Sequence, residues 1–269
     1  VAAKGTAFNG IAIEYDFVFP HQIERSLQVK KWPNLFLAGQ INGTSGYEEA
    51  AGQGLVAGIN AARYAAGTAP VVVRRDQAYL GVMIDDLVTK EILEPYRLFT
   101  SRAEHRLQLR QDNADLRLAD LGQAIGLLPA AAYRRVTALR AEIAVARHAL
   151  QAIRRHGATL WELLRQPEMQ LAQLPDAPAV SSRAAEQLEI EARYEVYCRR
   201  EDALAADLQR LEEWPVPDGF DFAAVPSLGA EARAKLAKRR PATLAQAARI
   251  DGVTPADLAL LQVRLHRTL

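Results

Sequence analysis

A glycine-rich turn between a strand pattern and a helix pattern is the segment of this chain best suited to bind a ligand. The turn covers residues 39–46 and follows Leu35–Ala38, a short apolar run typical of a buried strand. Backbone N–H groups in such a turn point outward at the positive end of the helix dipole, where a phosphate or an electron-rich ring can bind. Ordinary strand-to-helix turns share this pattern, so the spacing alone leaves both interpretations open.

The helix that follows the turn carries two further signals. Ser45 and Glu48 have the spacing of a capping box, which predicts that the helix begins there. Inside the helix, Ala50, Gly54 and Gly58 recur every four residues. Because each glycine costs a helix roughly 1 kcal/mol relative to alanine, this ridge of small residues predicts a close approach to a sheet or a ligand.

A cluster of arginines forms a second candidate site. Four arginines lie within fourteen residues that contain a single acid, Glu104, and aromatic side chains are interleaved with them. They are Arg97, Arg102, Arg106 and Arg110. Guanidinium groups beside aromatic rings suit phosphate contacts and base stacking on RNA. The alternatives are a solvated face or a set of salt bridges to the acidic segment 85–94.

The C-terminal tail is the third region of interest, because residues 231–269 hold eight Lys or Arg against three acids. Four of these cations end one predicted helix: Lys235, Lys238, Arg239 and Arg240. Cations at a helix C-terminus complement the helix dipole, which is a sufficient structural reason for some of them. Local clustering of this kind, rather than the net charge, is what indicates a nucleic-acid contact.

No catalytic or metal-binding arrangement is predicted. Asp85 and Asp86 are adjacent, so their side chains diverge on a helix or a strand and are poorly placed to share one substrate. We expect a structural role for them. The five histidines lack metal-ligand spacing, and Cys198 is expected to be a packed, unreactive thiol.

Composition places the chain among globular proteins, because its 269 residues are 49% hydrophobic and include no apolar run of membrane-spanning length. A single cysteine excludes an internal disulfide and suits a reducing cytoplasm. The chain begins with Val1 and lacks the Gly-x-Gly-x-x-Gly fingerprint of a dinucleotide-binding unit. We therefore expect it to be the C-terminal part of a longer protein.

Three regions follow one another and predict a mixed fold. Residues 1–70 have the pattern of the C-terminal end of an α/β domain, residues 71–125 of a linking α+β region, and residues 126–269 of a helical domain. Alternation predicts strands at Ile11–Asp16 and at His105–Arg110.

Two long apolar seams predict a helical pair in the third region. The first seam consists of Val136, Leu139, Ile143, Ala146, Leu150 and Ile153. The second consists of Ile190, Tyr194, Tyr197, Leu204, Leu208 and Leu211. Shorter helices are expected at about 230–238, 244–250 and 255–267, the last of them capped by Thr254.

The turn and several unusual strings together resemble the MnmG (GidA) family, the flavoprotein subunits of the tRNA wobble-uridine 5-carboxymethylaminomethyl modification enzyme. The strings after the turn lie at Asp76–Asp86, Glu94–Leu107, Arg110–Leu118, Arg165–Met169 and Gly252–Ala256. The resemblance covers nearly the whole chain. It implies the end of an FAD-binding α/β domain followed by a mostly α-helical domain that binds tRNA and a partner.

The resemblance also implies roles for particular residues. The flavin-contacting residues would be Gln40, Asn42, Gly43, Thr44 and Gly46. The arginine cluster and the four tail cations would contact tRNA, although His105 stands where the family often has tyrosine. The complete enzyme would be a cytoplasmic homodimer that works with the GTPase MnmE and uses FAD, NADH and a folate one-carbon donor. This chain alone is expected to be inactive and to retain no FAD.

Two other functions stay open from the sequence. One is a related flavoprotein of the folate-dependent tRNA uracil methyltransferase type, against which the long helical tail argues. The other is a non-enzymatic helical module that docks proteins, in which the arginines are ordinary surface. Salt-sensitive binding of tRNA would separate this last interpretation from the first.

Overall fold

The structure is a computed structural model that describes residues 16–19, 22–90, 94–212 and 214–266. The chain divides into two compact units. The first consists of residues 1–103 with 204–269, and the second of residues 104–203. The many helices and few short strands confirm the mixed fold with a helical C-terminal part. The three-part division expected from the sequence stays a prediction.

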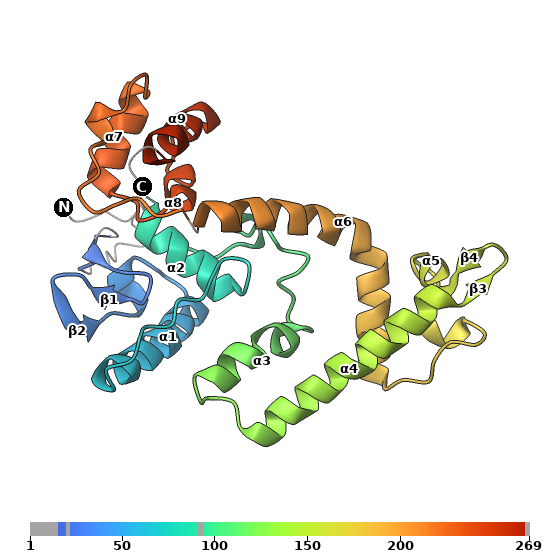
Figure 1. The fold of residues 1–269 in the computed structure, drawn as a ribbon. Helices are drawn as coiled ribbons and strands as arrows, with labels where there is room; N and C mark the ends of the chain where they lie inside the picture. The colour runs from blue at the N-terminus through green and yellow to red at the C-terminus, as the bar shows by residue number, and fades with distance from the viewer. Residues whose placement is uncertain (1–15, 20–21, 91–93, 213, 267–269) are drawn as a thin grey trace, which may run out of the picture. The chain divides into compact units, whose positions relative to one another are not determined.

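The N-terminal part of the first unit is a small hairpin beside two helices (Figure 1). The elements are β1 (Gln28–Val29), β2 (Trp32–Phe36), η2 (Gly39–Asn42), α1 (Tyr47–Ala65), α2 (Tyr79–Thr89) and η3 (Thr100–Arg102). The strands β1 and β2 are antiparallel, and η2 and η3 are 3-10 turns. The helix predicted after the glycine-rich turn is thus confirmed.

The buried strand expected at Leu35–Ala38 is only partly right. The strand β2 ends at Phe36, and its Leu35 side chain is 41% exposed. Its partner among the described residues is the two-residue β1. Because a two-stranded ribbon covers little surface, the apolar run lies in an exposed hairpin. The strand expected at Ile11–Asp16 falls outside the described residues, apart from Asp16.

The helices α1 and α2 share an apolar core. α1 contributes Val56 and Ala57, and α2 contributes Met83, Ile84 and Leu87, none of them more than 7% exposed. Burial along almost the whole of α2 matches its nearly continuous apolar sequence. This core fixes the position of α1, and with it the turn from which α1 begins.

Glycines on these two helices have opposite surroundings. A Cβ atom at Gly81 of α2 would collide with the backbone carbonyl of Arg74, because the preceding loop lies directly on the helix. A Cβ atom at Gly54 or Gly58 of α1 would meet no described atom within 4 Å. In the described part of the chain these two glycines of the ridge therefore have no packed neighbour, whereas Ala50 lies beside Gly39. Its expected role in packing or binding stays a prediction.

Substitution by alanine should consequently change the free energy of unfolding in opposite directions at Gly54 and Gly81. Gly54→Ala should raise the free energy of unfolding by about 0.5–1 kcal/mol through helix propensity. Gly81→Ala should lower it by about 1–3 kcal/mol through overpacking. Urea denaturation followed by the fluorescence of Trp32 and Trp214, in a Trp161→Phe background, measures both. A stabilised Gly81→Ala variant would contradict the close packing of this loop on α2.

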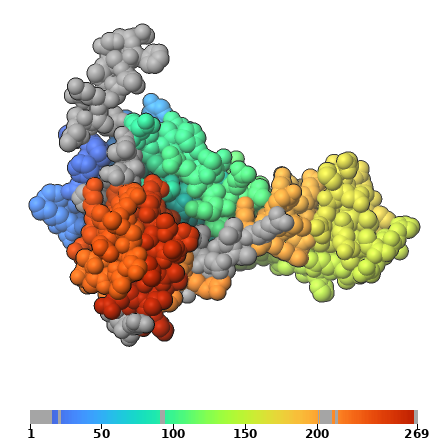
Figure 2. Space-filling view, turned by 90° about the horizontal axis from the view of Figure 1, so that it is seen from above, coloured from blue at the N-terminus to red at the C-terminus, as the bar shows by residue number. Residues whose placement is uncertain are grey.

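The C-terminal part of the first unit is a group of short helices, drawn orange to red in Figure 2, where they form one compact body. They are α7 (Ala230–Arg239), α8 (Leu244–Ala248) and α9 (Pro255–His266), after the 3-10 turn η5 (Phe222–Ala224). Leu236, Leu244, Leu261 and Leu265 are fully buried between them. The helices predicted here are confirmed to within two residues.

Thr254 caps α9 as the sequence predicts. Its hydroxyl accepts the N–H of Asp257 at 3.2 Å, and the Asp257 carboxylate accepts the N–H and the hydroxyl of Thr254 at 2.9 and 2.6 Å. These bonds, with one from the Gly229 N–H, hold the pKa of Asp257 below its usual range. A reciprocal cap of this kind defines where the last helix begins.

The second unit packs its helices around one apolar core. Its elements are α3 (Ala114–Ala124), α4 (Ala130–Ala152), β3 (Arg154–Arg155), β4 (Ala158–Thr159), α5 (Leu160–Leu164), η4 (Leu171–Gln173) and the start of α6 (Ser182–Glu212). The seam predicted on α4 is confirmed, because Ile143, Ala146 and Leu150 belong to this core and Val136 is buried. None of the helices described in either unit is both long and apolar enough to cross a membrane.

The seam predicted on α6 is wrong in its first half. Tyr194 and Tyr197 are 40% and 55% exposed, whereas Ala184, Leu188 and Ala192 are fully buried in the core shared with α4 and α5. Small alanines allow close packing of α6, and the larger tyrosines fall on the outer face. A seam drawn through the large apolar residues misses these alanines.

The strand expected at His105–Arg110 is also wrong. The segment forms a turn in which the His105 carbonyl oxygen accepts the N–H groups of Gln108 and Leu109, both at 3.0 Å. His105 and Leu109, four residues apart, are buried on its inner side, while Arg106 is exposed. The alternation in the sequence therefore reflects a single tight turn with one buried side.

Candidate functional site

The glycine-rich turn depends on glycines in the left-handed region. Gly39 and Gly43 have φ of +87° and +84°, which side chains with a Cβ atom rarely allow. Between them the chain forms η2, closed by a hydrogen bond from the Gly43 N–H to the Gln40 carbonyl at 2.8 Å. The backbone thus needs glycine at both ends of this short element.

A single side chain of α1, Gln53, holds the turn in shape. Its Oε1 accepts the N–H of Gly39 at 3.1 Å and Nδ2 of Asn42 at 2.8 Å, and its Nε2 donates to Oγ1 of Thr44 at 3.0 Å. Gln53 and Thr44 are fully buried, and Asn42 is 4% exposed. The side chains of Asn42 and Thr44 therefore support the turn from inside.

The helix α1 begins differently from the capping box that the sequence predicts. Its N-cap is Gly46, and no side chain caps it, so the box expected from Ser45 and Glu48 is wrong. The Glu49 carboxylate lies beside Gly46 instead, where a Cβ atom would collide with it. An acid in the first turn complements the positive end of the helix dipole. Gly46 is therefore needed to make room for Glu49.

Glu49 also connects the turn to a distant segment. Its Oε1 accepts the Leu98 N–H at 3.0 Å and lies 3.3 Å from Nε of Arg97. Burial raises the pKa of Glu49, but the hydrogen bond from Leu98 and the nearby Arg97 outweigh burial, and the pKa lies below its usual range. The carboxylate is ionised at neutral pH, and it joins the start of α1 to the chain around residue 98.

The five turn residues offer different groups to a ligand. Gln40 is exposed, and the backbone of Gly43 and Gly46 borders the start of α1. Oδ1 of Asn42 is buried and has no hydrogen-bond partner among the described residues. A donor on a bound molecule would satisfy that oxygen. The assignment of these residues to a cofactor stays a prediction.

A short parallel bridge connects the turn to Tyr96. The Tyr96 N–H donates to the Gly43 carbonyl at 2.8 Å, and the Ser45 N–H donates to the Tyr96 carbonyl at 3.3 Å. The phenol of Tyr96, which is 4% exposed, donates to Oδ2 of Asp86 at 3.0 Å. Two hydrogen-bonded steps therefore join the turn to α2.

Asp86 and Asp85 on α2 form the centre of a buried ionic cluster. Asp86 is fully buried and lies 2.7 Å from Nη1 of Arg75 and 3.0 Å from Nζ of Lys90. The Nη1 atom of Arg75 also lies 3.3 Å from Asp85, so one guanidinium bridges the two carboxylates. Buried charges are stable only when paired in this way. These contacts indicate the structural role expected for the two aspartates.

Asp85 extends the cluster to two other parts of the first unit. Its carboxylate is 1% exposed and lies 2.7 Å from Nη2 of Arg25, near the hairpin, and 2.7 Å from Nε of Arg249, at the end of α8. Nη2 of Arg249 donates to the second oxygen of Asp85 at 3.0 Å. Asp85 thus ties the C-terminal helices to α2, and through Asp86 and Tyr96 to the glycine-rich turn.

Tyr96 should give this unit a stability that decreases at high pH. Burial raises the pKa of the Tyr96 phenol well above its usual range, and the Asp86 carboxylate adds to the effect. The unfolded chain loses this proton at about pH 10, while the folded chain keeps it. The stabilisation that Tyr96 provides is therefore complete below about pH 10. Above that pH, the unfolding free energy falls by about 1.4 kcal/mol per pH unit.

Tyr96→Phe should accordingly flatten the fall in the unfolding free energy between about pH 10 and 11.5. Tyr47→Phe is the matched control, because the Tyr47 side chain is 94% exposed. Urea denaturation at a series of pH values measures both slopes. Equal slopes for the two variants would show that Tyr96 loses its proton as readily as an exposed tyrosine.

The arginines predicted to form one RNA-binding cluster are divided between the two units. Arg97 and Arg102 belong to the first unit, and Arg106 and Arg110 to the second. Nε of Arg102 donates to the Arg97 carbonyl at 2.9 Å, and its guanidinium lies 4.5 Å from the ring centre of Tyr96. Within the first unit the structure therefore brings two of the four together, beside an aromatic ring.

Arg110 is engaged in the second unit rather than open to solvent. It lies 3.1 Å from Asp112 and donates to the Leu107 carbonyl at 2.8 Å. Burial raises the pKa of Asp112, but hydrogen bonds from Arg110 and Gln187 outweigh burial and keep it below its usual range. Gln187 of α6 donates to Asp112 at 2.8 Å, so this cluster holds the turn against α6. Salt bridges are the alternative that the sequence left open for these arginines. Arg102 lies 4.0 Å from Asp86 of segment 85–94, whereas Arg110 pairs with Asp112 outside that segment.

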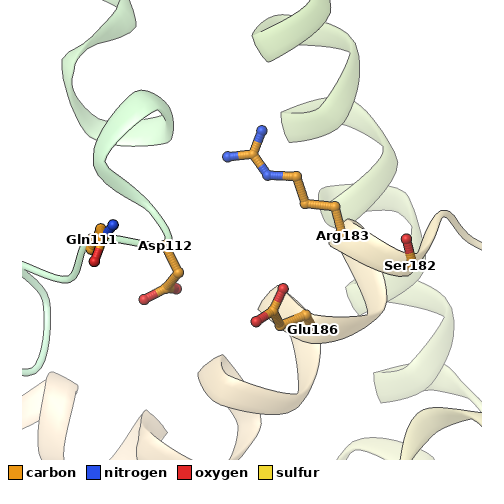
Figure 3. Close-up of a pocket in the computed structure, with 5 residues that line it drawn as sticks. All are labelled: Gln111, Asp112, Ser182, Arg183 and Glu186. Atoms are coloured by element: carbon orange, nitrogen blue, oxygen red, sulfur yellow. The ribbon is translucent and has the colours of Figure 1, made fainter.

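A shallow polar cavity of about 700 Å³ lies next to this cluster, between Gln111–Asp112 and the start of α6. Figure 3 shows the carboxylates of Asp112 and Glu186 facing this space. Nη2 of Arg183 donates to Asp115 at 2.6 Å, and Asp112 is held by its own partners. Paired charges in a shallow hollow indicate a structural joint between segments, not a binding pocket.

The tail cations have mixed surroundings. Nζ of Lys235 lies 2.7 Å from Glu231 and donates to the Asp251 carbonyl at 2.7 Å, so this residue is a structural link. Lys238 and Arg239 lie in the last turn of α7, where they complement its dipole. Arg240 follows at the C-cap with φ of 46° and an exposed side chain. A role of the four in tRNA binding stays a prediction.

Several residues of the site were missed from the sequence, among them Gln53, Glu49 and Arg249. Gln53 lies on the buried face of α1, three and four residues before Val56 and Ala57, and a polar residue at such a position signals a buried hydrogen-bond network. Glu49 lies on the same helix, one turn earlier. Arg249 gives no local signal, because its partner Asp85 is 164 residues away.

Family models match most of the chain. The model described as glucose inhibited division protein A matches residues 5–69. The model of the tRNA modifying enzyme MnmG/GidA C-terminal helical domain matches residues 94–202, and that of the C-terminal helical bundle of the same enzyme matches residues 204–269. These matches cover both compact units.

Individual relatives support the same assignment. The tRNA uridine 5-carboxymethylaminomethyl modification enzyme MnmG of Geobacter metallireducens is 48% identical over 94% of this chain and 44% of its own length. The enzyme of that name from Pediococcus pentosaceus is 46% identical over 96% of this chain and 44% of its own. Aquifex aeolicus GidA in its form II crystal has a TM-score of 0.85 and 45% identity, covering 94% of this chain and 44% of that one. The chain thus spans less than half the length of these relatives.

Proposed function

Because this chain belongs to the MnmG/GidA family of tRNA-modifying enzymes, we propose that it takes part in installing the (carboxymethyl)aminomethyl group at C5 of the wobble uridine in tRNA. The observation that carries this proposal is the identity of 46–48% over 94–96% of the chain to enzymes named for that modification. The contribution of the described residues is to position tRNA and to dock a partner. No catalytic residue is proposed among them.

FAD is the proposed cofactor of the whole protein, held at the glycine-rich turn by the residues that the resemblance assigns. The buried, unpartnered Oδ1 of Asn42 and the exposed Gln40 support this fit. The Glu49 carboxylate at the start of α1 disfavours a second negative charge there, which favours the flavin ring over the pyrophosphate at this position. FAD would supply the redox chemistry when bound. NADH and a folate one-carbon donor are proposed for the whole protein, without assigned residues.

Binding of tRNA is proposed to use exposed cations of both units. Arg106 is exposed, Arg97 is 54% exposed, and Arg240 is exposed after α7. Exposed guanidinium and ammonium groups suit contacts with RNA phosphates, which position the RNA without reading its sequence. Arg97 also pairs with Glu49 through its Nε atom. Arg102 and Arg110 have partners within the protein as well, are less exposed, and are proposed to orient their surroundings.

Fluorescence anisotropy with labelled tRNA at two salt concentrations tests the proposal. Arg97→Gln with Arg106→Gln should weaken binding and lower its salt dependence, by about one unit of log–log slope for each phosphate that the variant no longer neutralises. Arg199→Gln is the control, because this 74% exposed arginine pairs with Glu195. Absence of tRNA binding by the unchanged chain at low salt would contradict the proposal and favour a protein-docking module.

The GTPase partner MnmE and a second copy of the chain are the proposed protein partners. Large side chains on α6 support a docking role, because Tyr194 and Tyr197, three residues apart on one face of the helix, are 40% and 55% exposed. Exposed aromatic and aliphatic groups at helical spacing suit contact with another protein. Analytical ultracentrifugation of the chain, alone and with the GTPase, tests both partners.

A further inference from the structure

A cleft of about 490 Å³ lies in the first unit, away from the glycine-rich turn. One wall comes from residues 23–30 with parts of 70–72 and 88–89, and the other from residues 239–243 with Gln246 and Ile250. Its volume falls within the range of about 300–1,000 Å³ that small-molecule sites occupy. Segments far apart in the sequence meet there. Among its lining residues, Arg25 pairs with Asp85 and Arg240 is proposed above to contact tRNA, but the cleft itself has been given no role.

The cleft is lined by more positive than negative charge. Its charged lining residues are Arg25, Lys30, Arg239, Arg240 and a single acid, Glu24. Nζ of Lys30 lies 4.0 Å from Glu24, and both side chains are about half exposed, so this pair is weak. Arg25 already pairs with Asp85. Arg239 and Arg240 lie on the other wall, at the end of α7.

Apolar side chains line the rest of the cleft. Val72, Val88 and Pro241 are among them, and Val72 is 38% exposed. Polar groups lie between them, including Gln28 and Gln246. A cleft with cations at one part and apolar surface at another suits a ligand with a phosphate and a flat, partly apolar ring.

Arg240 lies at the mouth of this cleft in an unusual backbone conformation. It follows α7 with φ of 46° and ψ of 65°, a position at which helices usually have glycine. An arginine there costs stability relative to glycine. Arg240 nevertheless lines the cleft with an exposed side chain, which leaves it available for binding there.

From these observations we propose that the cleft binds a nucleotide. Lys30, Arg239 and Arg240 contact its phosphate, and the ring lies against Val72 and Pro241. The nucleotide belongs either to an RNA chain or to a free mononucleotide, since both present the same chemistry. If the nucleotide is part of an RNA chain (the RNA form of the proposal), the proposal rests on the tRNA binding proposed above. If it is a free mononucleotide (the free form), the proposal does not.

Two kinds of variant test the cleft in the 269-residue chain. Lys30→Gln with Arg240→Gln removes charge and keeps side-chain length. Ala242→Trp fills the cleft and keeps every charge, because Ala242 lines it and is itself exposed. Lys31→Gln is the matched control, since this exposed neighbour of Lys30 is not part of the lining. Circular dichroism melting confirms that each variant is folded.

The probes are fluorescein-labelled tRNA, measured by anisotropy, and uridine 5′-monophosphate, measured by calorimetry at low salt. Weakening of tRNA binding by about tenfold in both cleft variants, but not in Lys31→Gln, supports the RNA form. Binding of the mononucleotide that Ala242→Trp abolishes, with unchanged tRNA binding, supports the free form. Unchanged tRNA binding in all variants without mononucleotide binding overturns the cleft and the role of Arg240, and leaves the proposed tRNA binding through Arg97 and Arg106 standing. If neither probe binds the unchanged chain, the cleft proposal and the proposed tRNA binding are both overturned.

Discussion

Asp85→Asn should lower the unfolding free energy of the first unit by about 3–5 kcal/mol, the cost of removing one partner from a buried ion pair. The Asp85 carboxylate is 1% exposed and pairs with Arg25, Arg75 and Arg249 at 2.7–3.3 Å. Asparagine keeps the shape but leaves three guanidinium groups close together with less compensating charge. Their mutual repulsion and the missing hydrogen bonds both favour the unfolded state.

Asp76→Asn is the matched control for this variant. Asp76 also pairs with an arginine, Arg74, at 2.8 Å, but the two side chains are 29% and 45% exposed. Exposed pairs contribute about 0–1 kcal/mol, so the control should change little. Urea denaturation followed by Trp32 and Trp214 fluorescence measures both variants. If Asp85→Asn cost no more than Asp76→Asn, the cluster would not stabilise the unit.

A double-mutant cycle measures how much of the stability lost in Asp85→Asn comes from the pair of Asp85 and Arg249. Arg249→Met alone leaves part of the Asp85 charge without a partner, and combining it with Asp85→Asn should cost less than the sum of the two single changes. The difference for residues in direct contact is expected at about 0.5–3 kcal/mol. Additive effects would mean that the pair of Arg249 and Asp85 contributes nothing to holding the C-terminal helices to α2.

Helices were predictable from the sequence because their signals are local. The pattern from Tyr47 onward, the seam on α4 and the cap at Thr254 each depend on residues a few positions apart. Predictions failed where a periodic pattern had a different cause. The alternation at His105–Arg110 comes from one buried side of a turn. On α6, two of the buried core positions are Ala184 and Ala192, which a search for large apolar residues passes over.

The candidate site was predictable only in its backbone. Gly39 and Gly43 indicate the turn in the sequence, because its left-handed backbone conformation requires glycine at these two positions. The contacts that join the turn to the remainder of the unit are long-range. In the sequence, Tyr96 lies 53 residues after Gly43, and Arg249 lies 164 residues after Asp85. Contacts of this separation follow from tertiary packing, which a single sequence does not reveal.

Gln53→Met should lower the unfolding free energy of the first unit by about 2–4 kcal/mol, because it leaves buried polar groups without partners. Methionine fills a similar volume but offers neither the acceptor nor the donor. The Gly39 N–H and the Thr44 hydroxyl then lose the bonds that they form with Gln53 at 3.1 and 3.0 Å. Asn42 is affected less, because its Nδ2 also donates to the Leu37 carbonyl at 2.9 Å.

Gln123→Met, an exposed change on α3, is the control for Gln53→Met and should lie within about 0.5 kcal/mol of the unchanged chain. Hydrogen exchange at Gly39 and Ser45 distinguishes local from global loss, because the turn should open before α1 does. Equal stability of the two variants would mean that the glycine backbone and the bridge to Tyr96 hold the turn without Gln53. The turn would then need no support from α1, and Gln53 would have no part in shaping a cofactor site.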